Sequence, residues 1–373
     1  MQITNSRFSK FILYGIALLF FQLLEAARDQ VIVNALSHDR FGDKIIEYCI
    51  AKYFSLLYQI PLCFKSFEGS EKLNMSMYEE KYDMNIEKKY PHKILVRSEN
   101  EIASNLYPGT MFMIELEMPI IPLQKINAVL YRPTEPDPIF KKMQENKEFA
   151  TKIRKMIAPI HPFMNLTLPK DSITVAVHVR KGSYHDLDLG PLTSEQIFNK
   201  TKFGIDFYAP TKFPPEQFYI DQIKRLLALF KSSKFFIHIF TDDNNPEQIV
   251  QRFRHCINSD NVEFSYFHSN HYWHDTFVED YYAMSQFDIL IRPNSHLSGV
   301  SQLLGHHKLI LWPNSCAWEA NRLYILETAI FIPINQTDSV MEACIFENLG
   351  PEKIQQLCTI VTHQCQDNFS QKI

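Results

Sequence analysis

Glycine is scarce in this chain, with 10 glycines among 373 residues. No two of these glycines are two residues apart, and no two are five residues apart. Neither G-x-G-x-x-G nor G-x-x-x-x-G-K-[ST] therefore occurs, which excludes the standard dinucleotide fingerprint and the Walker phosphate loop. Any phosphate that this protein binds is held by another device.

Paired cysteines and excess positive charge are missing as well. The seven cysteines are an odd number and form no C-x-x-C pair, which argues against zinc and thioredoxin-like chemistry. With 38 Lys and Arg against 42 Asp and Glu, the net charge is -4, and nucleic acid is not an expected partner. The 46% apolar content is typical of a globular protein, and the length suits two domains.

The amino terminus is apolar. Arg7 and Lys10 precede an uncharged run over residues 11–24, about 14 residues and shorter than the roughly 20 that span a bilayer as a helix. We expect residues 1–27 to be a signal peptide or a signal anchor, a buried amino-terminal helix being the alternative. Either targeting segment predicts a secretory or membrane-associated protein, in the Golgi or endoplasmic reticulum lumen of a eukaryote, or at the membrane or secreted in a bacterium.

Residues 28–160 begin like a βαβ unit, and we assign them to an amino-terminal domain. Apolar runs predict strands, and helical spacing predicts helices, over the following ranges: strands 31–36, 60–64 and 111–121, and helices 44–58 and 138–157. Residues 65–110 are charged and weakly patterned.

Residues 161–345 form a clearer second domain of alternating strands and helices. The predicted strands are 172–179, 235–240, 262–267, 288–291 and 308–312, and the helices between them are 215–230, 246–256, 276–286 and 297–304. Strict alternation predicts a parallel sheet covered on both faces. The pattern favours an α/β protein with two Rossmann-like domains facing a cleft. Residues 346–373 form a tail whose helix we expect to pack on the first domain.

Ligands of open parallel sheets bind outside the carboxyl ends of the strands, so the residues after each apolar run are informative. His178, Arg180, Lys181 and Gly182 follow the strand 172–179. Arg binds two phosphate oxygens through its planar fork, and Gly182 permits a sharp turn. An ordinary basic strand end, with His178 as a packed residue, is the alternative.

The run His178–Gly182 resembles the H-x-R-R-G motif of the fucosyltransferase-like superfamily. Phe41-Gly42-Asp43, Phe240-Thr241-Asp242-Asp243 and residues 277–304 resemble three further motifs of that superfamily, in the same order. The resemblance implies a GT-B fold with a nucleotide-sugar site in the second domain and the acceptor on the first. It implies an inverting transfer of fucose, or a related sugar, from a GDP-sugar to a glycan or protein hydroxyl.

The resemblance also implies roles for residues of the second domain. Arg180 holds the diphosphate and stabilises the charge on the departing GDP, so no metal or other cofactor is required. Ser295 and Ser298, with Asn294, face the phosphate at a helix start, plain N-capping by Ser295 being the alternative. Asp242 or Asp243 would accept hydrogen bonds from the nucleotide base or ribose, a solvated turn residue being the alternative. Asp280 and Ser285 match the third motif, and a structural role for Asp280 is an equal alternative.

In the first domain, Gly42 stands where the superfamily brings the backbone near the diphosphate or acceptor. Asp43 is the candidate base for the acceptor hydroxyl, with N-capping as its alternative. Two metal signals are set aside: the Asp186-Leu187-Asp188 triplet follows a basic loop rather than an apolar strand, and the histidines at 268, 271 and 274 read as a loop.

Two functions from different classes remain open. One is the glycosyltransferase, with a nucleotide sugar and a glycan or glycoprotein acceptor as partners. The other is a glycan- or partner-binding protein that keeps the fold without catalysis. It is favoured by two departures from the motif, Lys181 in place of the second arginine and Ser183 in place of the usual acidic residue.

Overall fold

The computed structural model describes residues 30–36, 40–96, 99–114, 142–143, 146–161, 166–181, 210–267, 273–319, 322–333 and 341–370. Contacts along the chain divide it into two compact units, Met1–Glu117 and Met118–Ile373. The targeting segment expected over residues 1–27 lies outside the described residues. In the described part of the chain, no helix is both long and apolar enough to cross a membrane.

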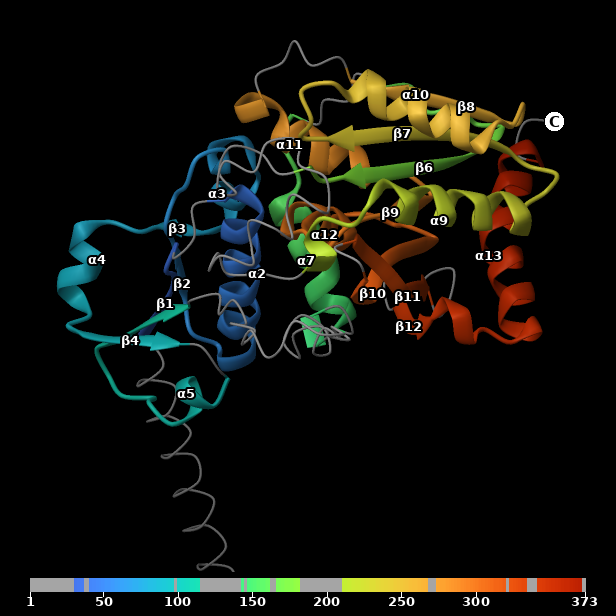
Figure 1. The fold of residues 1–373 in the computed structure, drawn as a ribbon. Coiled ribbons are helices and arrows are strands. Elements are labelled where there is room, and N and C mark those ends of the chain that lie inside the picture. The colour runs from blue at the N-terminus through green and yellow to red at the C-terminus, as the bar shows by residue number, and fades with distance from the viewer. Residues whose placement is uncertain are drawn as a thin grey trace, which may run out of the picture. The chain divides into compact units, whose positions relative to one another are not determined.

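The first unit is built on a five-stranded parallel sheet in the order β3-β2-β1-β5-β4 (Figure 1). Its strands are β1 (Gln30–Asn34), β2 (Leu62–Phe64), β3 (Glu80–Lys81), β4 (His92–Val96) and β5 (Thr110–Ile114). Its α-helices are α2 (Phe41–Tyr58), α3 (Met75–Tyr78), α4 (Met84–Lys89) and α5 (Glu99–Ala103), with a short 3-10 turn η1 (Ser70–Lys72).

The opening βαβ unit is confirmed, with α2 packed on β1 and starting three residues before the expected position. Strands β3 and β4 lie in the stretch that showed weak pattern. They are the two edges of the sheet and largely exposed, so no buried face imposes apolar alternation on them. The strand expected over 111–121 is described as β5 up to Ile114.

The second unit holds a seven-stranded sheet in the order β12-β11-β10-β9-β6-β7-β8. Its strands are β6 (Ser172–Val179), β7 (Lys234–Thr241), β8 (Val262–Tyr266), β9 (Ile289–Ile291), β10 (Leu309–Glu319), β11 (Arg322–Pro333) and β12 (Met341–Ile345). Its helices are α7 (Lys147–Ile157), α9 (Glu216–Leu229), α10 (Pro246–Ile257), α11 (Trp273–Met284), α12 (His296–Leu304) and α13 (Pro351–Ser370), with the 3-10 turns η2 (Pro210–Lys212) and η3 (Phe346–Asn348).

The strands that the sequence predicts, β6 to β10, are parallel as expected, whereas β11 and β12 were not predicted. Strand β11 pairs antiparallel with both β10 and β12. Only two residues separate Glu319, the end of β10, from Arg322, the start of β11. Two residues join antiparallel strands but are far too few for a parallel crossover.

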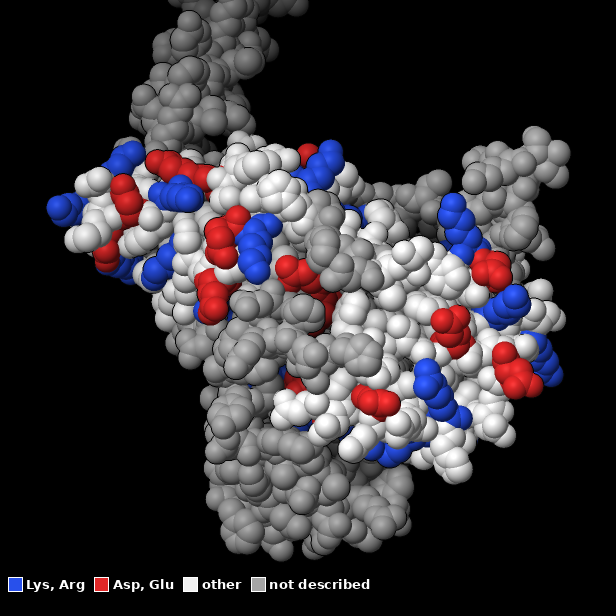
Figure 2. Space-filling view, turned by 90° about the horizontal axis from the view of Figure 1, so that it is seen from above, with Lys and Arg blue, Asp and Glu red and all other residues white. Residues whose placement is uncertain are grey.

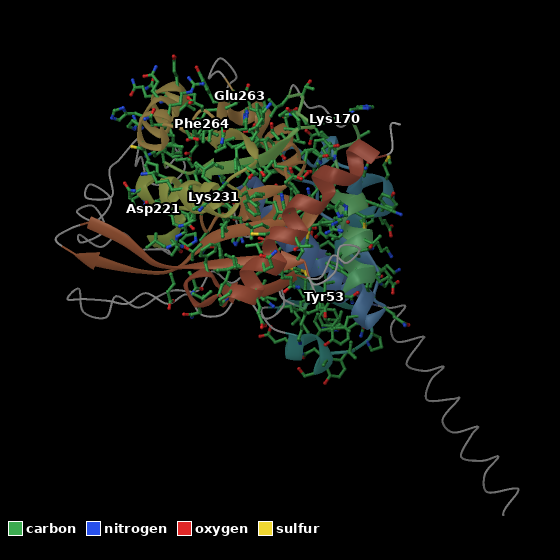
Figure 3. All side chains as sticks on the ribbon, turned by 90° about the vertical axis from the view of Figure 1, so that its right-hand side faces the viewer. Tyr53, Lys170, Asp221, Lys231, Glu263 and Phe264 are labelled. Carbon is green, nitrogen blue, oxygen red and sulfur yellow. The ribbon has the colours of Figure 1, made fainter. Side chains whose placement is uncertain are left out.

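Helices cover both faces of this sheet. One face carries Val175, Val177 and Val179 into a core shared with α9, α10 and α13. Leu357 and Val361 of α13 belong to that core, so the tail helix packs on the second unit and the expectation that it packs on the first is wrong. On β8, Phe264 is buried while its neighbour Glu263 is exposed, as strand alternation requires (Figure 3).

The other face is covered by α11, α12 and α7. Helix α7 packs on α12, and the Tyr281 hydroxyl of α11 donates to the Ile157 carbonyl at the end of α7. The contacts therefore place α7 in the second unit, whereas the sequence assigned its residues to the domain ending at 160.

The order of the strands reverses at β6. From β6 the chain moves to β7 and β8 on one side and then returns to β9 and β10 on the other. The parallel register pairs Val177 with Ile291, so the carboxyl ends of β6 and β9 are neighbours. Such a reversal is where open α/β sheets bind ligands.

Candidate anion-binding site

Arg180 and Ser295 meet at this reversal point. Arg180 directly follows β6, and Ser295 directly precedes α12, which follows β9. The Arg180 Nη1 donates a hydrogen bond to Ser295 Oγ over 3.1 Å, and the Arg180 guanidinium lies 5.4 Å from the Phe213 ring centre. A permanent cation is thus held beside the N-terminus of a nine-residue helix.

The N-terminus of α12 is not capped by a serine hydroxyl. Ser295 is the N-cap residue, but its side chain accepts no hydrogen bond from the helix backbone, and Ser298 Oγ donates to the Ser295 carbonyl over 3.2 Å. Both serines are buried. Asn294 is fixed by its backbone N–H, which donates to the Thr211 carbonyl. Plain capping by Ser295 is therefore not observed, and the positive end of the helix dipole is available for an anion.

Arg292 is a component of this site that the sequence analysis missed. It directly follows β9, and its side chain is only 5% exposed. Its Nε donates to Gln302 Oε1 over 3.0 Å, its Nη1 donates to the Pro293 carbonyl over 3.2 Å, and its guanidinium stacks 4.8 Å from the Trp312 ring centre. Burial lowers the pKa of Arg292 to about 9. The strand-end rule that identified Arg180 applies equally to Arg292.

His178 is buried on the same face of the sheet, two residues before Arg180. Burial, reinforced by the charges of Arg180 and Arg292, lowers the pKa of His178 to about 3. The ring is therefore neutral at physiological pH, and its Nδ1 has no hydrogen-bond partner among the described residues. His178 is thus a residue packed inside the protein, as the alternative to a role in binding expects. Its contact with substrate stays a prediction.

Lys181 is tied to the protein rather than left pointing into solvent. Its backbone N–H donates to Asp242 Oδ1 over 2.7 Å, and its Nζ pairs with Glu216. Glu216 also receives two hydrogen bonds from Arg252, of 2.7 and 2.8 Å. Burial opposes ionisation of Glu216, but Arg252 and Lys181 outweigh it and lower the pKa of this carboxyl. Glu216 thus holds the Lys181 ammonium in place, and Asp242 joins the turn after β6 to the end of β7.

The other predicted residues of the second unit have local partners. Asp243 Oδ1 accepts from the Asn245 N–H, a turn contact that precedes α10. Ser285 Oγ donates to the Tyr282 carbonyl at the end of α11. Burial, with a smaller contribution from Glu279, raises the pKa of Asp280 to about 7. Gly182 lies outside the described residues.

Gly42 and Asp43 lie in the first turn of α2, in the first unit. Arg40 is the N-cap residue of this helix, so Gly42 is helical rather than part of a loop, and Asp43 is not an N-cap. Asp43 is 6% exposed, and Glu47, one turn later on the same helix, is fully buried. Glu47 is a second buried carboxyl that the sequence analysis did not single out. The spacing of four residues puts it on the same helix face as Asp43.

Arg292 is buried, whereas Arg180 and Lys181 are partly exposed. On the face shown in Figure 2, the described acidic and basic side chains are interspersed, and no large region carries a single sign.

Among the described residues, no group of three or more His, Cys, Asp or Glu side chains is placed to hold a metal ion. Residues 186–188 and the histidines at 268 and 271 lie outside the described residues, and nothing is described of the side chain of His274.

No protein-family model matches the sequence, and no curated protein sequence matches it. The structure is similar to that of a point mutant of Arabidopsis thaliana FUT1 in complex with GDP, with a TM-score of 0.50, 10% identity, and coverage of 81% of this chain and 75% of that chain. It is also similar to POFUT1 in complex with GDP-fucose, with a TM-score of 0.40, 11% identity, and coverage of 75% of this chain and 95% of that chain. A third similar structure is the NodZ alpha-1,6-fucosyltransferase of Bradyrhizobium, with a TM-score of 0.38, 10% identity, and coverage of 85% of this chain and 99% of that chain. The predicted GT-B-like α/β fold, and the resemblance of this chain to fucosyltransferase structures, are confirmed at the level of fold.

Proposed function

We propose that this protein is an inverting, metal-independent glycosyltransferase that takes fucose, or a related sugar, from a GDP-sugar. One observation carries the proposal: Arg180 and Ser295 are hydrogen-bonded at the N-terminus of α12, at the point where the strand order reverses. A guanidinium and a helix N-terminus at a switch point suit a diphosphate. The fold shared with a GDP-bound fucosyltransferase supports GDP as the nucleotide.

In this proposal the second unit holds the donor. The Arg180 guanidinium contacts the diphosphate and stabilises the negative charge that grows on the leaving GDP. Electrostatic stabilisation of this kind is usually the largest single contribution to catalysis. The N–H groups in the first turn of α12 face the same phosphate. The neutral His178 packs behind Arg180 and does not act as the base, because its pKa is far below the working pH.

The first unit supplies the acceptor side in this proposal. An inverting transfer is assisted by a base that takes the proton of the acceptor hydroxyl. Asp43 is our candidate, and the fully buried Glu47 stands one turn behind it on α2. The acceptor class is a glycan or glycoprotein, and the destination is the secretory pathway or a membrane, reached through the amino-terminal segment.

Nucleotide binding tests the proposal directly. GDP is expected to raise the melting temperature of the full chain, with UDP and ADP as comparisons. Arg180→Ala is expected to weaken GDP binding about 100-fold, or about 2.7 kcal/mol, because the leaving phosphate loses its cation. Lys234→Ala is the matched control, since Lys234 is an exposed cation that pairs with Asp171 at the other end of β7. The absence of stabilisation by all three nucleotides would contradict the proposal.

A binding protein that has kept the fold is the second candidate. It is favoured by Lys181, which departs from the motif and whose ammonium pairs with Glu216. Incubation with radiolabelled GDP-fucose and a panel of glycan and protein acceptors separates the two functions. An enzyme releases GDP and labels an acceptor, whereas a binding protein does neither.

A further inference from the structure

Arg292 is a buried cation whose described partners are all neutral. Gln302 offers an amide oxygen, Pro293 and Ser295 offer backbone carbonyls at 3.2 and 3.5 Å, and Trp312 offers its ring face. No carboxylate pairs with Arg292 in the described part of the chain. Arginine is almost never fully buried without an opposite charge.

Three interactions make this position unfavourable for a cation. Removal of a charge from water is costly unless an opposite charge accompanies it. The N-terminus of α12 lies beside Arg292, and a helix N-terminus carries partial positive charge. Arg180 adds a like charge in the same neighbourhood, because Arg180 donates to Ser295 Oγ and Arg292 to the Ser295 carbonyl. The neutral hydrogen bonds and the Trp312 ring offset part of the first cost. An anion bound at this N-terminus relieves all three interactions.

The contacts of Arg292 also reach the proposed phosphate site. Its guanidinium holds the carbonyls of Pro293 and Ser295, and Ser295 Oγ accepts the hydrogen bond from Arg180. Its Nε holds Gln302, in the last turns of the same helix. Arg292 therefore holds the first turn of α12 in position through these hydrogen bonds, and it contributes positive charge to that turn.

We infer that Arg292 is a positioning residue that supplies charge to the phosphate site, so that binding there depends on the negative charge of the ligand. The inference rests on the proposed GDP site and deepens it. In this role Arg292 does not touch the nucleoside, and it acts on the phosphates through the first turn of α12 and through its field. Its loss is expected to weaken binding of the diphosphate and to leave binding of the nucleoside almost unchanged.

The test compares GDP with guanosine on three full-length proteins: wild type, Arg292→Lys and Arg292→Gln. Lysine keeps the charge and loses the planar stack, whereas glutamine keeps an amide donor for the carbonyls and loses the charge. The quantity measured is the ratio of the guanosine Kd to the GDP Kd, from calorimetry with displacement. Because both constants come from the same variant, a partly folded preparation still gives the ratio.

We expect the ratio to fall about tenfold in Arg292→Gln and to stay within about threefold of wild type in Arg292→Lys. Arg154→Gln is the matched control, because Arg154 donates to carbonyls at the opposite end of α12, and its ratio should not change. Equal ratios in wild type and Arg292→Gln would overturn the inference, as would an equal loss of GDP and guanosine binding. Failure of wild type to bind GDP would instead overturn the proposed function on which the inference rests.

Discussion

The two ends of helix α12 both receive arginines, but only one end gains stability from them. At the C-terminus, Arg154 donates to the carbonyls of Leu303 and Gly305 over 3.0 and 3.1 Å, and its charge complements the helix dipole. At the N-terminus, Arg180 and Arg292 place positive charge against the positive end of the dipole. The C-terminal arrangement is explained by the fold alone, whereas the N-terminal one is the arrangement that the proposed anion site requires.

The C-terminal end of α12 is also held by packing and hydrogen bonds to the sheet. Beyond the C-terminus of α12, His307 Nδ1 contacts the Phe287 carbonyl over 2.8 Å. Lys308 pairs with Asp288 over 2.7 Å, and that carboxylate also accepts hydrogen bonds from the backbone and hydroxyl of Thr174 on β6. These contacts lock the C-terminal end of the helix to the sheet. Substitutions there should affect stability, and substitutions at the N-terminus should affect ligand binding.

The largest effect on stability is expected for Gly305→Ala. A Cβ at Gly305 would lie 2.8 Å from the backbone carbonyl of Ser285 and 2.6 Å from His307 Nε2, and backbone cannot move aside cheaply. We expect a loss of about 3 kcal/mol in the free energy of unfolding, the upper part of the range for overpacked cores. Urea denaturation measures the loss, and the GDP affinity of the folded protein should not change.

Gly350→Ala is the control for this substitution, because a Cβ at Gly350 meets no atom within 4 Å. Its free energy of unfolding should stay within about 0.5 kcal/mol of wild type, as for most exposed positions. If Gly305→Ala were as stable as Gly350→Ala, the tight packing at the C-terminus of α12 would be refuted. A loss of GDP affinity in folded Gly305→Ala would remove the division between the two ends.

A smaller effect is expected from acid, because a buried histidine stands near each end of the helix. Burial lowers the pKa of His307 to about 4 and that of His178 to about 3, from an ordinary value of 6.5. The unfolded chain therefore takes up protons first, and the stability that each neutral ring supports is lost as the pH falls from 6.5 towards 4. One such group accounts for about 1.6 kcal/mol between pH 6.5 and 5.0.

His307→Gln checks this contribution at the C-terminal end. The variant lacks the titrating ring, so its free energy of unfolding should fall less steeply than that of wild type, by about 1.4 kcal/mol per pH unit below pH 6. Urea titrations at pH 6.5, 5.8 and 5.0 give the slopes. Identical slopes in the two proteins would show that folding does not lower the pKa of His307.

Much of the second unit was predictable because its strands are short apolar runs between amphipathic helices. Arg180 was identified from sequence, since it ends the longest such run and stands beside a second cation. Arg292 ends an equally apolar strand, but a lone arginine there is ordinarily solvated. Its burial depends on Trp312, twenty residues away, and on Gln302 of the next helix. Contacts of that kind arise only from the tertiary structure.

In α2 the sequence predicted the helix correctly but not where the helix begins. Its apolar spacing indicates a helix, but residues Phe41–Asp43 include a glycine that suggested a loop. In the structure they form the first turn, with Asp43 and Glu47 buried beneath. Burial of two carboxyls on one helix face runs against the residue preferences that sequence interpretation uses. Deviations of this kind are expected at functional sites.

The smallest effect is expected for Ser295→Ala, which separates capping from ligand binding at the N-terminus of α12. Ser295 Oγ accepts from Arg180 and caps no helix N–H, so its removal should leave the free energy of unfolding within about 0.5 kcal/mol of wild type. GDP affinity should fall about fivefold, because Arg180 loses the acceptor that orients it. Ser301→Ala is the control, since the buried Ser301 hydroxyl lies on the same helix without a hydrogen-bond partner in the described part of the chain. A destabilised Ser295→Ala with unchanged GDP affinity would return Ser295 to the role of a cap, and would make the two ends of α12 alike.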